Sequence, residues 1–205
     1  MSHLIAGVDV SRETIQDLEA FGALVAKWTP KINLIAKGTT GDIWDRHIID
    51  SVQIYQYAPK QFEKWVDLGS GGGFPGIVMA VLGKTQQPNA RFILIESDQR
   101  KAMFLRTAIR ELNVQAEVMA ERIEAVDPQG ADIVSARALT ALSSLIPLVA
   151  RHLDSKGIAL LHKGKQASQE VAEAQMHASF ELEDHASFTD LNARILAIQR
   201  ITLRG

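Results

Sequence analysis

The sequence predicts an α/β fold built on a mostly parallel sheet, with helices ahead of the sheet in the chain and an antiparallel hairpin at its end. From Lys64 onward, short apolar runs alternate with longer amphipathic segments, which is the pattern of parallel strands joined by helices on both faces of a sheet. A glycine-rich turn follows the first apolar run. Two segments with period-two alternation close the chain. Helical spacing dominates the residues before Lys64.

Residues 1–60 are predicted to form a helical extension that packs on the sheet. Ser11–Trp28 has the periodicity of an amphipathic helix, and the hydroxyl of Ser11 is suited to cap its first turn. The apolar residues at helical spacing are Ile15, Leu18, Phe21, Leu24 and Val25. A second helix is predicted over Asp42–Tyr57, because Pro59 follows it and cannot continue a helix.

Residues 61–205 are predicted to form one compact α/β unit. The predicted parallel strands are Lys64–Leu68, Arg91–Glu96, Gln115–Met119, Ala131–Ser135 and Ile158–His162. The predicted helices are Gly76–Leu82 (begun by Pro75), Asp98–Leu112, Leu142–Leu153 and Gln166–Gln175. The closing hairpin is predicted over Ser179–Phe188 and Arg194–Leu203. In such a sheet a ligand binds beyond the carboxyl ends of the strands, beside the first strand.

Composition excludes several classes of protein. The chain of 205 residues has no cysteine, which excludes disulfides, cysteine-ligated metals and a cysteine nucleophile and fits a cytoplasmic location. No pair of histidines has metal-ligand spacing, so no metal is expected. A signal peptide is not expected, and Pro147 interrupts the most apolar segment, so neither is a membrane span. With a net charge of -2, a nucleic-acid partner requires a local basic surface.

The stretch VDLGSGGGFPG, residues 66–76, is the candidate ligand-binding turn. Gly69, Gly71 and Gly73 allow backbone to approach a ligand closely, and the spacing also satisfies G-x-G-x-x-G, a weak signal for a dinucleotide. Asp67 favours a different cofactor, since a carboxylate beside this turn repels a pyrophosphate but attracts the ammonium and sulfonium groups of S-adenosylmethionine. The alternative role for Asp67 is to cap the loop.

Glu96 ends the second predicted strand. There it is placed to accept hydrogen bonds from both ribose hydroxyls of an adenosine, which either cofactor contains. The alternative is a solvated strand end. Taken with Asp67, Glu96 favours a methyltransferase that uses S-adenosylmethionine over an NAD-dependent dehydrogenase.

Three further segments give the chain a resemblance to a known family. Arg46–Ser51 (RHIIDS) lies upstream of the turn, and Ala136–Ala138 (ARA) and His162–Gly164 (HKG) lie downstream. With G-F-P-G in the turn, their order over residues 32–165 resembles the bacterial small-subunit ribosomal RNA guanine-N7 methyltransferases, the glucose-inhibited division protein B family. The resemblance implies a Rossmann-like domain that uses S-adenosylmethionine to methylate N7 of one guanine in small-subunit (16S) ribosomal RNA, free or within the small ribosomal subunit.

The resemblance also implies site residues. Matching motifs place cofactor contacts at Gly69, Phe74, Ile123, Glu124 and Arg137. Two departures are present: Ala136 stands where the family has serine, with Ser135 one place earlier, and His162 stands where it has leucine. They leave open what the serine hydroxyl does, but they do not affect the arginine.

The implied chemistry fits the residues that are present. Guanine N7 has an in-plane lone pair and no proton, so alignment of donor and acceptor is required but a general base is not. Arg137 follows the fourth predicted strand, in place of the [D/N]-P-P-[Y/F] motif of enzymes that methylate exocyclic amines. It is suited to bind guanine O6, a phosphate or the cofactor carboxylate. His47 is expected to position other groups or to contact RNA.

RNA contact is expected from cations around the mouth of the cofactor site. The substrate candidates are Arg46, His47, Arg137, Lys163 and Lys165, with Lys31, Lys37, Arg100 and Lys101 as further cations. Two other functions stay open. A small-molecule S-adenosylmethionine-dependent methyltransferase is compatible with the acidic pI, and a non-enzymatic adenosine-binding module would bind the cofactor without turnover.

Overall fold

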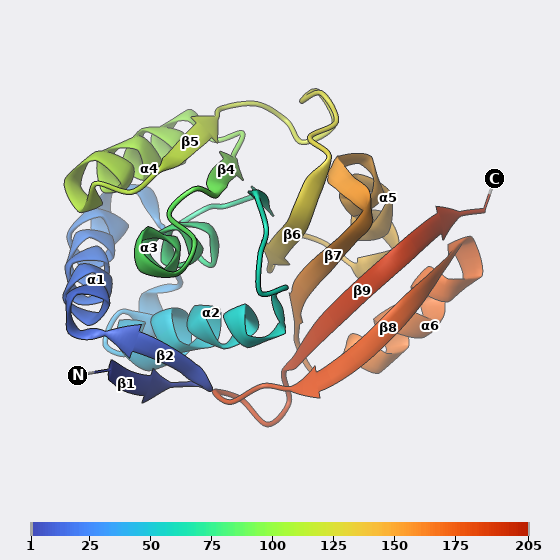
Figure 1. The fold of residues 1–205 in the computed structure, drawn as a ribbon, viewed down its shortest axis with the longest axis horizontal. Coiled ribbons are helices and arrows are strands. Elements are labelled where there is room, and N and C mark those ends of the chain that lie inside the picture. The colour runs from blue at the N-terminus through green and yellow to red at the C-terminus, as the bar shows by residue number, and fades with distance from the viewer. Residues whose placement is uncertain (1, 205) are drawn as a thin grey trace.

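A 7-stranded sheet in the order β5-β4-β3-β6-β7-β9-β8 forms the centre of the molecule (Figure 1). The computed structural model describes residues 2–204, apart from the side chains of Ser2 and Lys37. The strands of the sheet are β3 Lys64–Leu68, β4 Arg91–Ile95, β5 Ala116–Met119, β6 Ala131–Arg137, β7 Leu153–Lys163, β8 Ala178–Ala186 and β9 Arg194–Leu203. β3 to β7 pair in parallel, whereas β9 pairs antiparallel with β7 and β8. The predicted fold class is confirmed.

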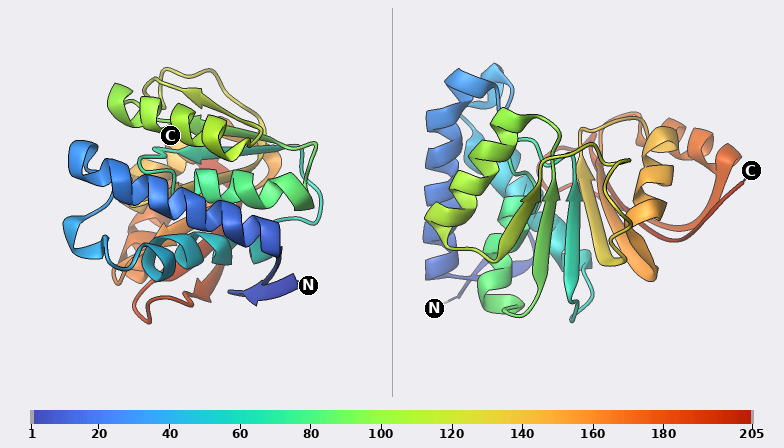
Figure 2. Two further views of the ribbon diagram at one scale, coloured as in Figure 1. Left: turned by 90° about the vertical axis from the view of Figure 1, so that its left-hand side faces the viewer. Right: turned by 90° about the horizontal axis from the view of Figure 1, so that it is seen from above.

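Helices cover both faces of the sheet (Figure 2). The longer ones are α1 Arg12–Ile32, α3 Gly76–Gln86, α4 Gln99–Leu112, α5 Leu142–His152 and α6 Ala167–His177. α1, α3 and α4 share one hydrophobic core with Trp65 and Leu94, and α5 and α6 share the other with Val66 and Ile93. Successive strand residues point to opposite faces, so a strand buried on both sides is apolar throughout.

The N-terminal extension begins with a hairpin that the sequence did not predict. β1 Ser2–Ile5 and β2 Val8–Ser11 pair antiparallel and lead directly into α1. The predicted cap is confirmed, because Oγ of Ser11 accepts a hydrogen bond from the backbone N–H of Thr14 at 3.1 Å. α1 continues past the predicted end at Trp28 and includes Pro30 in its last turn, where the missing N–H leaves the carbonyl group of Ala26 without its usual helical donor.

The second predicted helix is not a regular α-helix. Its place is taken by a π-helix η2 Trp44–Ile49, a single α-turn α2 Asp50–Val52 and a 3₁₀ helix η3 Gln53–Tyr57, preceded by the 3₁₀ turn η1 Lys37–Thr39. Side chains compete for its carbonyl groups: Ser51 Oγ donates to His47 O at 2.7 Å, and Gln53 Nε2 donates to Asp50 O at 3.0 Å. Such bonds bend helices, and π-turns are frequent at functional sites.

Two strands are longer than predicted. β6 continues two residues beyond the predicted end at Ser135, so Arg137 is its last residue, and β7 starts at Leu153 rather than Ile158. Arg137 pairs in register with His162 of β7. The extended ends bring the family-like segments of β6 and β7 side by side at the carboxyl edge of the sheet.

Candidate functional site

The turn between β3 and α3 presents bare backbone to the space beyond it. Its backbone is tied to the neighbouring strand, since Ser70 N donates to Ile95 O at 3.1 Å. Gly69 has a φ of +64°, and a Cβ at Gly72 would lie 2.8 Å from the carbonyl oxygen of Leu34. Both positions therefore require glycine.

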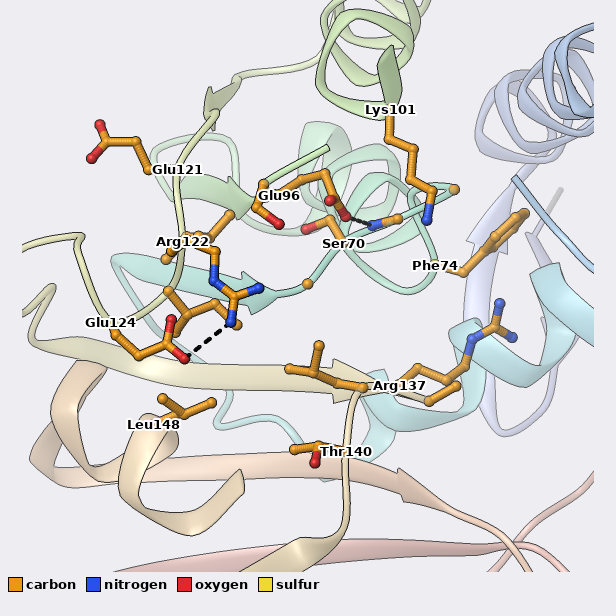
Figure 3. A pocket seen from close by; sticks show the side chains of 18 of the residues that line it. Ser70, Phe74, Glu96, Lys101, Glu121, Arg122, Glu124, Arg137, Thr140 and Leu148 are labelled. Carbon is orange, nitrogen blue, oxygen red and sulfur yellow. Dashed lines mark hydrogen bonds and ion pairs between the residues drawn. The ribbon is translucent and has the colours of Figure 1, made fainter. Parts of the chain in front are cut away.

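A cavity of about 650 Å³ opens at this turn, beyond the ends of β3, β4 and β6. This cavity is called the larger cavity below, because a smaller one adjoins it. Phe74 and Arg137 lie at one end of it, and Glu121 and Glu124 lie at the other (Figure 3). The predicted cofactor residues on its wall are Gly69, Gly71, Phe74, Glu96, Ile123, Glu124 and Arg137. Its size and its position at the switch point of the sheet are typical of a small-molecule site.

Glu96 links the two loops that form the floor of the larger cavity. Its Oε2 accepts from the N–H of Gly71 at 2.8 Å, and its Oε1 accepts from the N–H of Asp98 at 2.7 Å. Each carboxylate oxygen has about two lone pairs, so one acceptor site on each oxygen is left for a ligand. A ribose diol, with its two neighbouring hydroxyls, fits this pair of acceptors.

The loop after β5 forms the end of the larger cavity that lies away from Phe74 and Arg137. Ile123 is held there through its carbonyl oxygen, which accepts from Nε2 of His152 on α5 at 3.0 Å. Glu124 forms an exposed ion pair with Arg122 at 3.4 Å (Figure 3). The apolar side chain of Ile123 and the polar group of Glu124 thus face one end of the cavity.

Two of the predicted cofactor residues, Asp67 and Gly73, do not line the larger cavity. Asp67 is 1% exposed and lies beneath the turn, where its Oδ1 accepts from Ser135 Oγ at 2.7 Å and its Oδ2 from Gly76 N at 3.2 Å. It is therefore a loop-capping carboxylate, the alternative role given above, and the prediction that it faces a ligand is wrong. A Cβ at Gly73 would lie 2.9 Å from the Phe21 ring, so this glycine permits packing against α1.

The structure shows what the hydroxyl of Ser135 does, a question that the sequence left open. Its Oγ donates to Asp67 and accepts from Nε1 of Trp65 at 2.8 Å. The three buried side chains form a hydrogen-bonded chain between β3 and β6. Such a network fixes the end of β3, from which the glycine turn departs.

The buried carboxyl of Asp67 gives a testable dependence of stability on pH. Burial raises its pKa to about 6, above the value in the unfolded chain, so the folded state binds this proton more tightly. The stabilisation is fully present below about pH 4 and is lost as the pH rises through about 6. Relative to Asp67→Asn, the wild type should lose about 3 kcal/mol of unfolding free energy in total between about pH 3 and pH 7. Urea unfolding of both proteins across this range, with Asp127→Asn as an exposed control, measures it; parallel curves would contradict it.

Arg137 joins the R-H-x-x-D-S segment to the cavity. Its Nη1 donates to Asp50 Oδ2 at 3.1 Å, and its Nη2 donates to His47 Nδ1 at 2.9 Å. The guanidinium carbon lies 5.0 Å from the centre of the Phe74 ring, within the range of a cation–π interaction. Two segments about 90 residues apart in the sequence thus fix the orientation of one planar cation.

His47 is neutral in this arrangement. Burial and the neighbouring Arg137 charge lower its pKa to about 4. Because Nδ1 accepts from Arg137, the proton lies on Nε2, which donates to Thr39 Oγ1 at 2.8 Å. Both ring nitrogens are occupied, one by Arg137 and one by Thr39, and His47 does not line either cavity.

A second cavity, of about 540 Å³, adjoins the larger one. The segment Arg137–Thr140 lines both, and the smaller cavity continues to the end of β7 and the first turn of α6. His162, which replaces the family leucine, lies on its wall and donates from Nε2 to Asp50 O at 2.8 Å. Burial lowers the pKa of His162, so this histidine is also neutral.

The predicted RNA-contacting cations differ in exposure. Lys163 is only 9% exposed, and its ammonium group donates to Glu170 Oε2 and Thr140 O, each at 2.7 Å. It lines the smaller cavity, and its ammonium group is bonded within the protein, so it is not an exposed cation. Arg46 and Lys165 are exposed. The side chain of Lys37 lies outside the described residues.

Comparison with known proteins identifies the family. The family described as "rRNA small subunit methyltransferase G" matches residues 14–199. The chain belongs to this family. A ribosomal RNA small subunit methyltransferase G from Cereibacter sphaeroides is 48% identical over 198 residues, covering 97% of this chain and 96% of the relative. The one from Rhizobium meliloti is 41% identical over 209 residues, covering 100% of this chain and 97% of the relative.

Solved structures share the Rossmann-like fold of this methyltransferase G family member at low identity. A putative transferase from Pyrococcus horikoshii superposes with a TM-score of 0.61 at 16% identity, covering 100% of this chain and 72% of that chain. A SAM-dependent methyltransferase from Aquifex aeolicus gives 0.59 at 9% identity, covering 76% and 91%. Among residues 2–204, none of the helices has the length and apolar character needed to cross a membrane.

Several residues that line the larger cavity of this methyltransferase G family member were not predicted from the sequence as cofactor contacts. They are Leu34, Ser70, Gly72, Ser97, Lys101, Glu121, Arg122, Ala138, Leu139, Thr140, Ser144 and Leu148. The sequence predicts Lys101 only as an RNA contact. In the structure its side chain projects from α4 toward the turn (Figure 3). Ser97 directly follows the predicted strand end at Glu96, a signal that could have found it, whereas Ala138 follows the observed end of β6. Leu34 comes from the extension, far from the glycine turn in the sequence.

Proposed function

We propose that this protein transfers a methyl group from S-adenosylmethionine to N7 of one guanine in small-subunit ribosomal RNA. The observation that carries the proposal is the match to the methyltransferase G family over residues 14–199, combined with a glycine-floored cavity at the switch point of the sheet. The names of the relatives support the RNA as substrate class. The choice of guanine N7 comes from the family resemblance and from the chemistry of the site.

The residues present fit the cofactor. Bare backbone at Gly69 and Gly72 admits close contact, and the free acceptor sites of Glu96 suit the ribose diol. Ile123 offers an apolar contact for adenine, while Phe74 and Arg137 at the far end are placed beside the methionine part. When bound, S-adenosylmethionine supplies an electrophilic methyl group on a positively charged sulfur.

The site supports an alignment mechanism without a general base. Both nitrogens of His47 are engaged, and Asp50 accepts from Arg137, Gln53 and Thr189. These groups therefore orient Arg137 instead of accepting a substrate proton. Arg137 lines both cavities, so donors of its guanidinium that the cluster leaves free can bind guanine O6, which fixes the base without blocking N7.

A labelling experiment tests the proposal. The protein is incubated with S-adenosylmethionine carrying a labelled methyl group and with naked ribosomal RNA, intact small subunits or a metabolite mixture. We expect label on one guanine of the small-subunit RNA, at a position that becomes sensitive to cleavage specific for N7-methylguanine. Label confined to metabolites would select the small-molecule alternative. Cofactor binding without any transfer would select a non-enzymatic module.

Exposed cations near the site should contribute to RNA affinity through phosphate contacts. For the double variant Arg46→Ala/Lys165→Ala we expect about tenfold weaker binding and a salt dependence whose slope is shallower by about 1.4, since each single-strand contact contributes about 0.7. Affinity for the RNA measured at several salt concentrations tests this. Lys156→Ala is the matched control, because Lys156 is exposed near the opposite end of β7. An unchanged slope in the double variant would remove both residues from the RNA surface.

A further inference from the structure

The smaller cavity contains two carboxylates, which differ in how their oxygens are used. Both oxygens of Asp50 are engaged: Oδ1 accepts from Gln53 and Thr189, and Oδ2 accepts from Arg137. Glu170 has one oxygen to spare. Its Oε2 accepts from Lys163 and from the N–H of Leu142, whereas its Oε1 has no partner among the described residues. Oε1 therefore keeps both lone pairs for a donor in the cavity.

Glu170 is held in a fixed orientation. Oε2 lies 2.7 Å from Lys163 Nζ on β7 and 2.8 Å from the backbone nitrogen of Leu142 at the start of α5. Glu170 itself stands in the first turn of α6, and its side chain is 20% exposed. Three elements thus position one carboxylate on the wall of the cavity. A group placed this way loses little entropy on binding and is suited to recognition.

Charged side chains of both signs line the smaller cavity. Glu170 is on its wall with a free acceptor, and Arg137 is on the part of the wall shared with the larger cavity. Ala138, next to Arg137, has a φ of +51°, a sparsely populated conformation for a residue with a Cβ. The backbone between the two cavities is therefore held in a specific conformation directly after Arg137.

Guanine has the matching polarity. Its Watson–Crick edge carries two adjacent donors, N1–H and the N2 amine, with the acceptor O6 beside them, and O6 and N7 together form its Hoogsteen edge. Adenine has a donor, its N6 amine, where guanine has O6, and it has no N1–H. A guanine whose donors face Glu170 presents O6 and N7 toward Arg137 and the larger cavity.

We propose that Oε1 of Glu170 accepts hydrogen bonds from the Watson–Crick edge of the target guanine, so that Glu170 selects guanine and directs N7 toward the methyl donor. This inference rests on the proposed function and adds the residue that reads the base. It makes Glu170 a substrate-contacting residue and assigns the smaller cavity to the base.

Inosine in place of the target guanosine tests the contact, because inosine lacks the N2 amine but keeps N1–H, O6 and N7. Small subunits are reconstituted with either nucleoside at the modified position, and kcat/KM is measured. The wild type should prefer guanosine by at least about tenfold, as expected when a bond to a positioned polar group is lost. In Glu170→Gln, whose amide oxygen can still accept from Lys163 and Leu142, the preference should fall to within about threefold.

Glu173→Gln, one turn along α6 and outside the cavity, should keep the wild-type preference. Glu170→Asp, which retains the charge but withdraws the oxygen, serves as a second variant. Both Glu170 variants should bind S-adenosylmethionine normally, since Glu170 does not line the larger cavity. A purely structural role would change activity on both nucleosides equally.

Equal kcat/KM for guanosine and inosine with the wild type would overturn the inference without any variant. An undiminished preference in Glu170→Gln would do the same, while the proposed function would stand. If the wild type leaves N7 of guanine unmethylated in intact small subunits, the proposed function fails and this inference fails with it.

Discussion

Replacing Arg137 with alanine is expected to lower the turnover number for methyl transfer by about 10²–10³-fold, which is the range for removing an orienting group from an alignment-dependent reaction. The guanidinium is held by Asp50 and His47, lies over Phe74 and lines both cavities. No other described residue both lines the two cavities and carries a positive charge. Single-turnover assays with small subunits and saturating cofactor give the number directly.

The variant will also be less stable, and the two effects must be separated. Removing the arginine leaves Asp50 without its cationic partner in a largely buried position. Thermal unfolding and cofactor affinity therefore accompany the activity assay. Arg200→Ala is the control, because the side chain of Arg200 is 75% exposed and its one ion pair among the described residues is with Glu181. Near-normal turnover in a folded Arg137→Ala protein would remove this residue from the site.

Arg137→Lys distinguishes charge from geometry. A lysine keeps the positive charge, but its single ammonium group cannot reproduce the planar fork that reaches Asp50 and His47 together. We expect it to recover stability more than turnover. Full recovery of turnover would mean that charge alone suffices.

The sheet could be predicted because its strands are buried on both faces. Val66 and Trp65 are adjacent and both buried, as in a strand between two helical layers, so the run is apolar throughout and stands out from its polar flanks. The glycine turn and Pro75 then fixed where α3 begins. The ends of the strands were harder to predict. β6 continues to Arg137 because Ser135 and Ala136 still pair with β7, and this pairing joins segments that are distant in the sequence.

The N-terminal extension was harder to predict because its structure depends on tertiary contacts. The β1–β2 hairpin turns at Ala6 and Gly7, both with positive φ, and Ala6 gives no sequence signal for this conformation. Likewise, the π-turn of η2 places His47 and Asp50 against Arg137, which is about 90 residues away. Only the folded chain brings these groups together.

At the site, sequence reasoning located the loops but not the direction of every side chain. Asp67 and Glu96 both come from strand ends beside the turn, yet Glu96 reaches the cavity and Asp67 points beneath it. The difference arises from Ser135, whose hydroxyl holds Asp67 from the neighbouring strand. The cofactor therefore cannot be assigned from the charge of Asp67. The family match assigns it instead, and Glu96 fits the adenosine ribose of that cofactor.

Glu96→Ala is expected to weaken S-adenosylmethionine binding by about 10²–10³-fold. Loss of two hydrogen bonds to a charged acceptor accounts for about 3–4 kcal/mol. The variant also leaves the N–H groups of Gly71 and Asp98 without their partner, which loosens the turn. Isothermal titration calorimetry measures the dissociation constant. Glu121→Ala is the matched control, because Glu121 lines the same cavity but has no side-chain bond among the described residues.

A cofactor analogue separates direct contact from loop support. S-adenosylmethionine with a 2′-deoxyribose lacks one of the hydroxyls that Glu96 is expected to bind, so the wild type should bind it at least about tenfold more weakly. In Glu96→Ala the same deletion should have little effect, because its partner is already gone; the coupling between the two changes measures the bond itself. If the deoxy analogue loses equal affinity in both proteins, Glu96 supports the turn without touching the ribose. In that case the two acceptor sites it offers to the cavity serve another group.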